Sequence, residues 1–182
     1  MNDRLQLAFG TKLEHNDYTG VEIQPSVRAL WRFAERHRVW AAVSRAVRTP
    51  DRSENDMVNK TWRSIVLGSS DFVSEDILAY EIGYRVQPID SLSIDVAAFF
   101  NDYDNLLTIE RGALISGLRT LLLDNKMDGE TFGLEVSTNW DVTDSWKLAA
   151  GYTYLQMQLH LDKASVDKGR DVSIEGESPQ NQ

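Results

Sequence analysis

The stretch "LAYEIGYRVQPIDSLSIDVAAFF", residues 78–100, alternates apolar and polar side chains on both sides of a short break. Glu81, Arg85 and Asp95 occupy polar positions of this pattern. The apolar positions are Leu78, Tyr80, Ile82, Tyr84 and Val86 before the break, and Leu92, Ile94, Val96, Ala98 and Phe100 after it. Because successive side chains of a strand point to opposite faces, this period predicts two strands joined by a turn at 88–91.

The same period recurs over residues 5–13, 21–33, 131–140 and 146–154, and a further strand without a clear alternation is expected from Val39 to Arg48. No comparable stretch favours a helical repeat. We therefore expect an all-β chain, an antiparallel up-and-down sheet of about seven to eight strands. Pro25 lies inside the second strand, where it removes a ladder hydrogen bond, so a bulge or an edge is expected there.

The connections between the strands alternate in length. Short turns fall at 34–38, 88–91 and 141–145, whereas longer polar connections fall at 50–74, 109–128 and 162–180, with a shorter one at 15–20. Transmembrane barrels of the bacterial outer membrane have short periplasmic turns and long extracellular loops. A soluble sandwich has no reason to sort its loops in this way, so the pattern favours a barrel wall.

The positions of the tryptophans support the same reading. Four of the five lie beside the short turns: Trp31, Trp40, Trp140 and Trp146. Aromatic rings form girdles where hydrocarbon meets headgroups, whereas a sandwich core would favour tryptophan near strand centres. We expect these four residues to form one interface girdle.

The strand "WAAVSRAVR", residues 40–48, contains arginine among apolar residues. Neither of its faces is clearly apolar, so periodicity alone does not choose between them. An arginine that faces lipid near the midplane costs about 2–4 kcal/mol. We therefore expect Arg45 to face a polar lumen, together with Glu81, Arg85, Asp95 and Glu135, and Trp40 to face lipid.

Composition excludes several classes of function. The formal net charge of −9 argues against a nucleic-acid partner, and the absence of cysteine excludes disulfides and thiolate sites. No apolar run is long enough for a transmembrane helix, and the first residues do not resemble a signal peptide. The chain is then either cytosolic or a piece of a longer protein.

No catalytic or metal-binding pattern is present in the sequence. His15, His37 and His160 have no ligand spacing, and an EF-hand loop beginning at Asp102 would need residues that the chain lacks. The serines have no matching histidine or elbow motif. We expect no enzyme activity, no cofactor and no metal site.

Four segments resemble the barrels of TonB-dependent outer-membrane receptors: "WAAVSRAVRTP" (40–50), "SEDILAYEIGYRVQP" (74–88), "LSIDVAAFFNDYDNL" (92–106) and "TFGLEVSTNWDVTDSWKLAAGYTYL" (131–155). In addition, "EGESPQNQ" (175–182) resembles the approach to a further strand. The order and spacing of the segments agree with the family over nearly the whole chain.

The resemblance implies that residues 1–182 are part of a 22-stranded barrel with a plugged lumen. The family imports scarce nutrients such as iron–siderophore complexes or cobalamin across the bacterial outer membrane. Its partners would be membrane lipid, the plug domain of the same full-length chain, the TonB complex acting through that plug, and a small cargo such as a metal chelate. The plug and the final strands are absent from this sequence.

Cargo contacts would come from the outer loops. Trp62 beside Arg63 offers an aromatic ring and a cation, and Arg111 begins the next loop. The alternative for Trp62 is a solvated loop in which the ring folds over its own neighbouring base. For the whole chain, the alternative is a soluble β-sheet binding or interaction module, in which the apolar faces would form a dry core.

Overall fold

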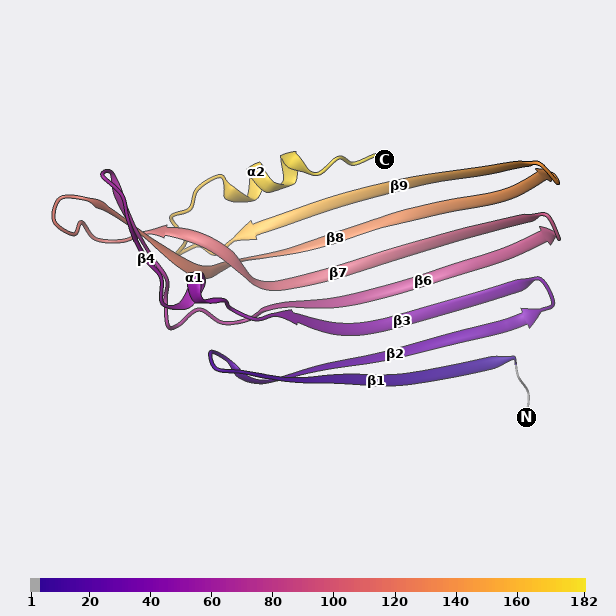
Figure 1. The fold of residues 1–182 in the computed structure, drawn as a ribbon, viewed down its shortest axis with the longest axis horizontal. Helices are drawn as coiled ribbons and strands as arrows, with labels where there is room; N and C mark the ends of the chain where they lie inside the picture. The colour runs from indigo at the N-terminus through magenta and orange to yellow at the C-terminus, as the bar shows by residue number, and fades with distance from the viewer. Residues whose placement is uncertain (1–3) are drawn as a thin grey trace.

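The computed structural model describes residues 4–182 as one curled layer of β-structure (Figure 1). The long strands are β1 (Leu5–Asn16), β2 (Gly20–Ala34), β3 (His37–Arg48), β6 (Glu75–Ile89), β7 (Leu92–Arg111), β8 (Arg119–Thr143) and β9 (Trp146–Leu161). Shorter elements lie in the connections: α1 (Arg52–Asn55), β4 (Val58–Lys60), β5 (Ser64–Leu67) and α2 (Arg170–Glu177). The all-β prediction is confirmed, with the seven long strands at the expected places.

Each long strand pairs antiparallel with the next one along the sheet, in the order β1, β2, β3, β6, β7, β8 and β9. β8 is long enough to have two neighbours on one side. Its later part pairs with β9, whereas its first residues pair in parallel with β5, for example Leu121 with Val66. The hairpin of β7 and β8 therefore extends past the wall and carries β5 and β4 (Figure 1).

The three short turns lie at one end of the sheet and the long connections at the other (Figure 1). Only two residues separate β2 from β3, β6 from β7, and β8 from β9. The predicted long connection at 109–128 is partly wrong, because the ladder continues through Leu107 with Asn125 to Arg111 with Leu121. In this part of the ladder Ile109 lies opposite Leu123, whose side chain is buried.

Pro25 causes no shift of register between β1 and β2, where it lies opposite Thr11. The pairing of β2 with β3 instead begins only after the proline, at Ser26 with Ser44. The expected bulge is therefore absent. The ladder between β2 and β3 stops before Pro25, so within that ladder no residue of β3 lacks a partner because of the missing proline N–H.

The wall has little core of its own. Apart from Ala42, the buried apolar residues are Ile65, Phe72, Leu123, Met127 and Leu159. These five lie in the long connections or in the strand ends beside them, whereas large apolar side chains on the wall, such as Phe9 and Ile82, are 75% and 56% exposed. A single-layered sheet that exposes a large apolar face requires an apolar environment against that face.

No helix within residues 4–182 is long and apolar enough to span a membrane.

Candidate functional site

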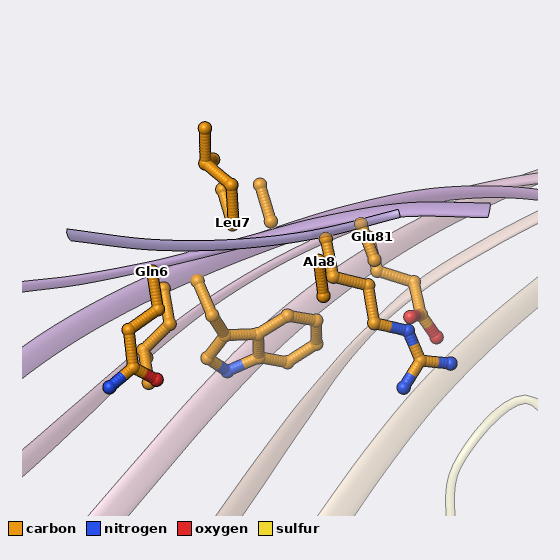
Figure 2. A pocket seen from close by; sticks show the side chains of 10 residues that line it. Gln6, Leu7, Ala8 and Glu81 are labelled. Atoms are coloured by element: carbon orange, nitrogen blue, oxygen red, sulfur yellow. The ribbon is translucent and has the colours of Figure 1, made fainter. Parts of the chain in front are cut away.

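The two faces of the sheet differ in chemistry. Strand pairing places Glu81 opposite Ala42, Arg85 opposite Asp95, and Glu135 opposite Ala97, all on one side, which we call the polar face. The other side, the apolar face, carries the exposed rows of Leu, Ile, Val and aromatic residues. Figure 2 shows Gln6 and Glu81 on the polar face and Leu7 pointing away from it.

Hollows lie along the polar face. One of about 510 Å³ lies over β1, β2, β3 and β6, with Gln6, Arg28, Trp40 and Glu81 in its lining (Figure 2). Two others, of about 290 and 320 Å³, lie on either side of Ala97 and Glu135. The polar face is therefore a surface with room for water or for another folded segment.

The expected position of Trp40 is wrong. Trp40 lies opposite Leu30 and Gly83, which places it on the polar face with Glu81. Its indole packs on Gly83, where even a Cβ atom would overlap the ring. Glycine on the neighbouring strand thus provides the space for this tryptophan, which is a known way of covering a glycine in a sheet.

The expected position of Arg45 is also wrong. Arg45 lies five residues after Trp40 in the same strand, so its side chain points to the opposite face of the sheet. Arg45 lies opposite Leu78 on the apolar face. Its Nε atom lies 2.6 Å from Asp76 Oδ1, and its Nη1 atom donates to the carbonyl oxygen of Ile23 at 2.6 Å. That carbonyl is accessible because the pairing of β2 with β3 does not reach it.

The position of Arg45 along the strand explains why it is tolerated on the apolar face. It lies eight residues beyond His37, or about 20 Å along the barrel axis for a tilted strand. An apolar band is about 25 Å tall, and a charge costs little near its edge. Ion pairing with Asp76 lowers the cost of Arg45 further, so energetics alone does not force an arginine into a lumen.

Trp31, Trp140 and Trp146 lie on the apolar face near the short turns. Side chains that the sequence reading did not include extend this group. Phe33 packs 5.5 Å from Trp31 between ring centroids, and the Nδ1 atom of His37 lies 2.6 Å from the hydroxyl oxygen of Tyr84. These residues form an aromatic belt that fits a membrane interface.

The loop candidates do not form a common site. The guanidinium carbon of Arg63 lies 3.9 Å from the ring centroid of Trp62, whose side chain is otherwise 78% exposed. The ring is thus folded over its neighbouring base, as the alternative reading expected. Arg111 is exposed at the end of β7, opposite Leu121, and lies across β8 from this pair.

A different hollow lies at the end with the long connections, and we call it the outer vestibule. Its volume is about 460 Å³. Its lining comprises Tyr103, Leu106, Leu107, Met127, Thr131, Met157, Leu159, Arg170 and Ile174, with Arg48, Glu54 and Glu75 also contributing. The sequence analysis did not predict this site. One signal was available, since Met157 and Leu159 are apolar residues at positions of the polar face, where they line the outer vestibule together with residues of α2.

One side of the outer vestibule is fixed by ion pairs. Arg48 bridges Glu54 of α1 at 2.8 Å and Glu75 of β6 at 2.7 Å. Asp51 and Glu54 form a capping box at the start of α1. Hydrogen bonds from the Ser53 hydroxyl and the Glu54 N–H lower the pKa of Asp51, so the cap is charged at neutral pH.

The opposite side is fixed by the connection from β9 to α2. Ser165 Oγ and Val166 N each donate to Glu110 at 2.7 Å, and Ile109 N donates to Asp167 at 2.7 Å. Burial alone would raise the pKa of Glu110, but these bonds to its carboxylate hold the pKa below its usual value. The ionised carboxylate of Glu110, in the part of the β7–β8 hairpin beyond the wall, therefore holds the connection between β9 and α2 in place.

Replacing Glu110 with alanine is expected to free this connection. The Ser165 hydroxyl and the Val166 N–H would lose their acceptor, so hydrogen exchange at Val166 should accelerate about tenfold or more. Because the folded-state pKa is lowered, the contribution of Glu110 is present above its unfolded pKa and is lost as the pH falls through the folded value. The protection of the Val166 N–H, measured as its exchange rate relative to the intrinsic rate at the same pH, should therefore also fall in acid for the native chain but not for the variant. Glu177→Ala at the exposed end of α2 should behave as native.

Comparison with known proteins assigns the chain to a family. The sequence model described as "TonB dependent receptor-like, beta-barrel" matches residues 1–182. The chain belongs to the TonB-dependent receptor barrel family. It is therefore a wall segment of a bacterial outer-membrane barrel, in agreement with the resemblance of its strands.

Curated and solved relatives of this family agree with the assignment. The chain is 24% identical over 165 residues to the iron-regulated outer membrane virulence protein of Vibrio cholerae, covering 84% of this chain and 25% of that protein. It matches the siderophore receptor PirA of Pseudomonas aeruginosa with a TM-score of 0.76 at 18% identity, over 86% of this chain and 32% of that one. It also matches a ferric enterobactin receptor, PfeA, of the same species in complex with enterobactin (TM-score 0.72, 19% identity, 85% and 25% coverage). The chain thus spans about a quarter of the length of the curated relatives it matches.

Proposed function

We propose that the chain forms part of a receptor that imports ferric siderophores, and that the outer vestibule contributes to the cargo site. The observation that carries this proposal is the location of the outer vestibule. It opens on the polar face at the end with the long connections, which is the extracellular end in an outer-membrane barrel.

The size and lining of the outer vestibule suit a metal chelate. Its volume of about 460 Å³ falls within the range of small-molecule sites. Tyr103 and Met157 offer soft, apolar contact, and Arg170 of α2 adds a cation for an anionic ligand. Relatives described as iron-regulated or as siderophore receptors favour an iron chelate over cobalamin.

The two faces are assigned different partners by this proposal. The apolar face contacts membrane lipid, and the polar face, with Glu81, Arg85, Asp95 and Glu135, faces the lumen. The plug domain of the full-length protein would fill that lumen, and the TonB complex would act through the plug. Since one sheet holds all the strands within residues 4–182, no second sheet covers the apolar face there, and the soluble-module alternative is not favoured.

Tyr103→Ala tests the assignment of the outer vestibule. Removing this ring from the lining should weaken binding of the cognate ferric siderophore by about tenfold, as expected for loss of a buried aromatic contact. The measurement is binding of iron-55-loaded siderophores by outer membranes that contain the full-length protein. Tyr18→Ala, at the same end of the wall but outside the outer vestibule, is the matched control.

Two results would contradict the proposal. If no ferric siderophore binds while cobalamin does, the cargo class is wrong. If Tyr18→Ala and Tyr103→Ala weaken binding equally, the outer vestibule has no special role in cargo binding.

A further inference from the structure

The ladder between β2 and β3 ends well before the two strands do. Its last pair is Ser26 with Ser44, which leaves residues 20–25 of β2 and residues 45–48 of β3 unpaired with each other. We call this stretch the seam. The ladders on either side of it, β1 with β2 and β3 with β6, continue to the ends of these strands. Figure 1 shows the hairpin of β1 and β2 diverging from β3 toward the long connections.

Pro25 provides a physical reason for the seam. In an antiparallel strand the N–H and C=O of one residue point to the same neighbouring strand, as do those of the residue two positions away. The carbonyl oxygen of Ile23 accepts a hydrogen bond from Arg45 of β3, so the backbone of Pro25 faces β3 as well. Since proline has no N–H, the ladder finds no donor at the position after Ser26.

Side chains replace the ladder bonds along the seam. The Nη1 atom of Arg45 donates to the carbonyl oxygen of Ile23 at 2.6 Å. The Val47 N–H donates to the side-chain oxygen of Gln24 at 3.4 Å, which is longer than the usual value of about 2.9 Å. Only a few bonds must therefore break for the two strands to separate here, and such regions open locally at low cost.

A latch closes the outer end of the seam. Glu22 of β2, which is only 9% exposed, accepts hydrogen bonds from Ser74 Oγ at 2.6 Å and from Thr19 Oγ1 at 2.8 Å. Ser74 directly precedes β6, so its bond fastens the β1–β2 hairpin to the neighbouring part of the wall. A cleft of about 640 Å³ lies here, lined by Tyr18 of the hairpin on one side and by residues 70–74 on the other.

The seam adjoins the outer vestibule through the start of β6. Ser74 and Asp76 contact residues of the seam, whereas Glu75, between them, lines the outer vestibule and pairs with Arg48. Successive residues of one strand thus serve the two features in alternation. A movement at the seam therefore changes the rim of the outer vestibule.

We propose that the seam is a built-in opening of the wall. Residues 12–24 of the β1–β2 hairpin form a flap that swings away from β3, with its hinge at Pro25 and the bond between Glu22 and Ser74 as its latch. Opening of the flap widens the outer vestibule sideways at the outer edge of the apolar band. The inference rests on the place of this chain in an outer-membrane barrel and not on the identity of the cargo.

Hydrogen exchange in the full-length protein, in detergent micelles, tests whether the seam opens. The Val47 N–H faces the seam, whereas the N–H of Ala46, one residue earlier at nearly the same depth, faces β6 opposite Ile77. Relative to their intrinsic rates, Val47 should exchange about tenfold faster than Ala46 or more. Equal protection at the two positions would overturn the proposal.

Pro25→Val should close the seam. Valine restores the missing N–H and suits a strand, so the ladder gains its next pair and exchange at Val47 should slow about tenfold or more. Pro88→Val is the matched control, because it makes the same change in β6 beside a short turn, far from the seam. It should leave exchange at Val47 unchanged.

Ser74→Ala should release the latch. The Glu22 carboxylate then loses the donor that joins the flap to the wall, and exchange at Val47 should accelerate about threefold or more. Ser70→Ala is the matched control. Ser70 lines the same cleft but does not donate to Glu22 in the part of the chain that the structure describes.

The outcomes distinguish a moving flap from a fixed gap. Slower exchange in Pro25→Val together with faster exchange in Ser74→Ala supports the flap. Fast exchange at Val47 that neither variant changes would overturn the proposal, because the two strands would then be permanently apart. Siderophore binding by outer membranes is measured separately. Its absence, with the exchange results as expected, would contradict the proposed function and leave the seam standing.

Discussion

Ala98→Arg should prevent most of the protein from assembling in the outer membrane. Ala98 lies opposite Ile82 and Leu134 on the apolar face, six residues along β7 from the short turn. For a tilted strand this is about 15 Å along the barrel axis, close to the middle of an apolar band about 25 Å tall. An arginine that faces lipid near the midplane costs about 2–4 kcal/mol, which is a large part of the stability of a typical domain. The yield of folded protein in membranes, and its unfolding by urea in detergent, should both fall accordingly.

The neighbouring residue provides a control at the same depth and with the same side chain. Ala97 lies opposite Gly83 and Glu135 on the polar face, between two hollows of about 290 and 320 Å³. Ala97→Arg should therefore find room and a carboxylate partner, and change the free energy of unfolding by less than about 1 kcal/mol. If Ala97→Arg is the more damaging of the two, the assignment of the faces is reversed.

Gly133→Val should have a comparable effect through packing alone. A Cβ atom on Gly133 would overlap the carbonyl oxygen of Tyr154 and approach Phe99 Cζ to 2.7 Å. The carbonyl belongs to the backbone of β9 and cannot turn away without breaking the ladder. We expect a loss of about 3 kcal/mol or more in the free energy of unfolding, seen as loss of the folded form in membranes.

Gly151→Val tests whether the effect at Gly133 is specific. Gly151 lies on the same face of the adjacent strand, but the nearest atom to a Cβ there, the carbonyl oxygen of Val136, is 3.9 Å away. Valine also suits a strand better than glycine does. Equal damage at both positions would mean that glycine is needed for flexibility during assembly, and not for the close approach of β8 to Phe99 and β9.

Periodicity predicted most of the wall because the period of a strand is a local property. Glu81, Arg85 and Asp95 alternate with apolar neighbours, and the structure does place them on one face with Glu135. The faces of Trp40 and Arg45 were predicted wrongly because their strand has no clear alternation. The choice then depended only on the cost of an arginine that faces lipid. The contact of Trp40 with Gly83 and the ion pair of Arg45 with Asp76 decide the two positions, and these partners are 43 and 31 residues away in the chain.

The sequence by itself determined the strands, the short turns, and the sorting of apolar and polar side chains to opposite faces of the sheet. Each of these depends on residues within a few positions of one another. Tertiary structure decided the phase of β3, the outer vestibule and the apposition of Arg38 with Arg85. Each of these arises where side chains from several strands or from α2 meet, and the register of the ladders sets which ones do so. Arg38 and Arg85, for example, belong to different strands, and only the register of the ladder between β3 and β6 places them directly opposite each other.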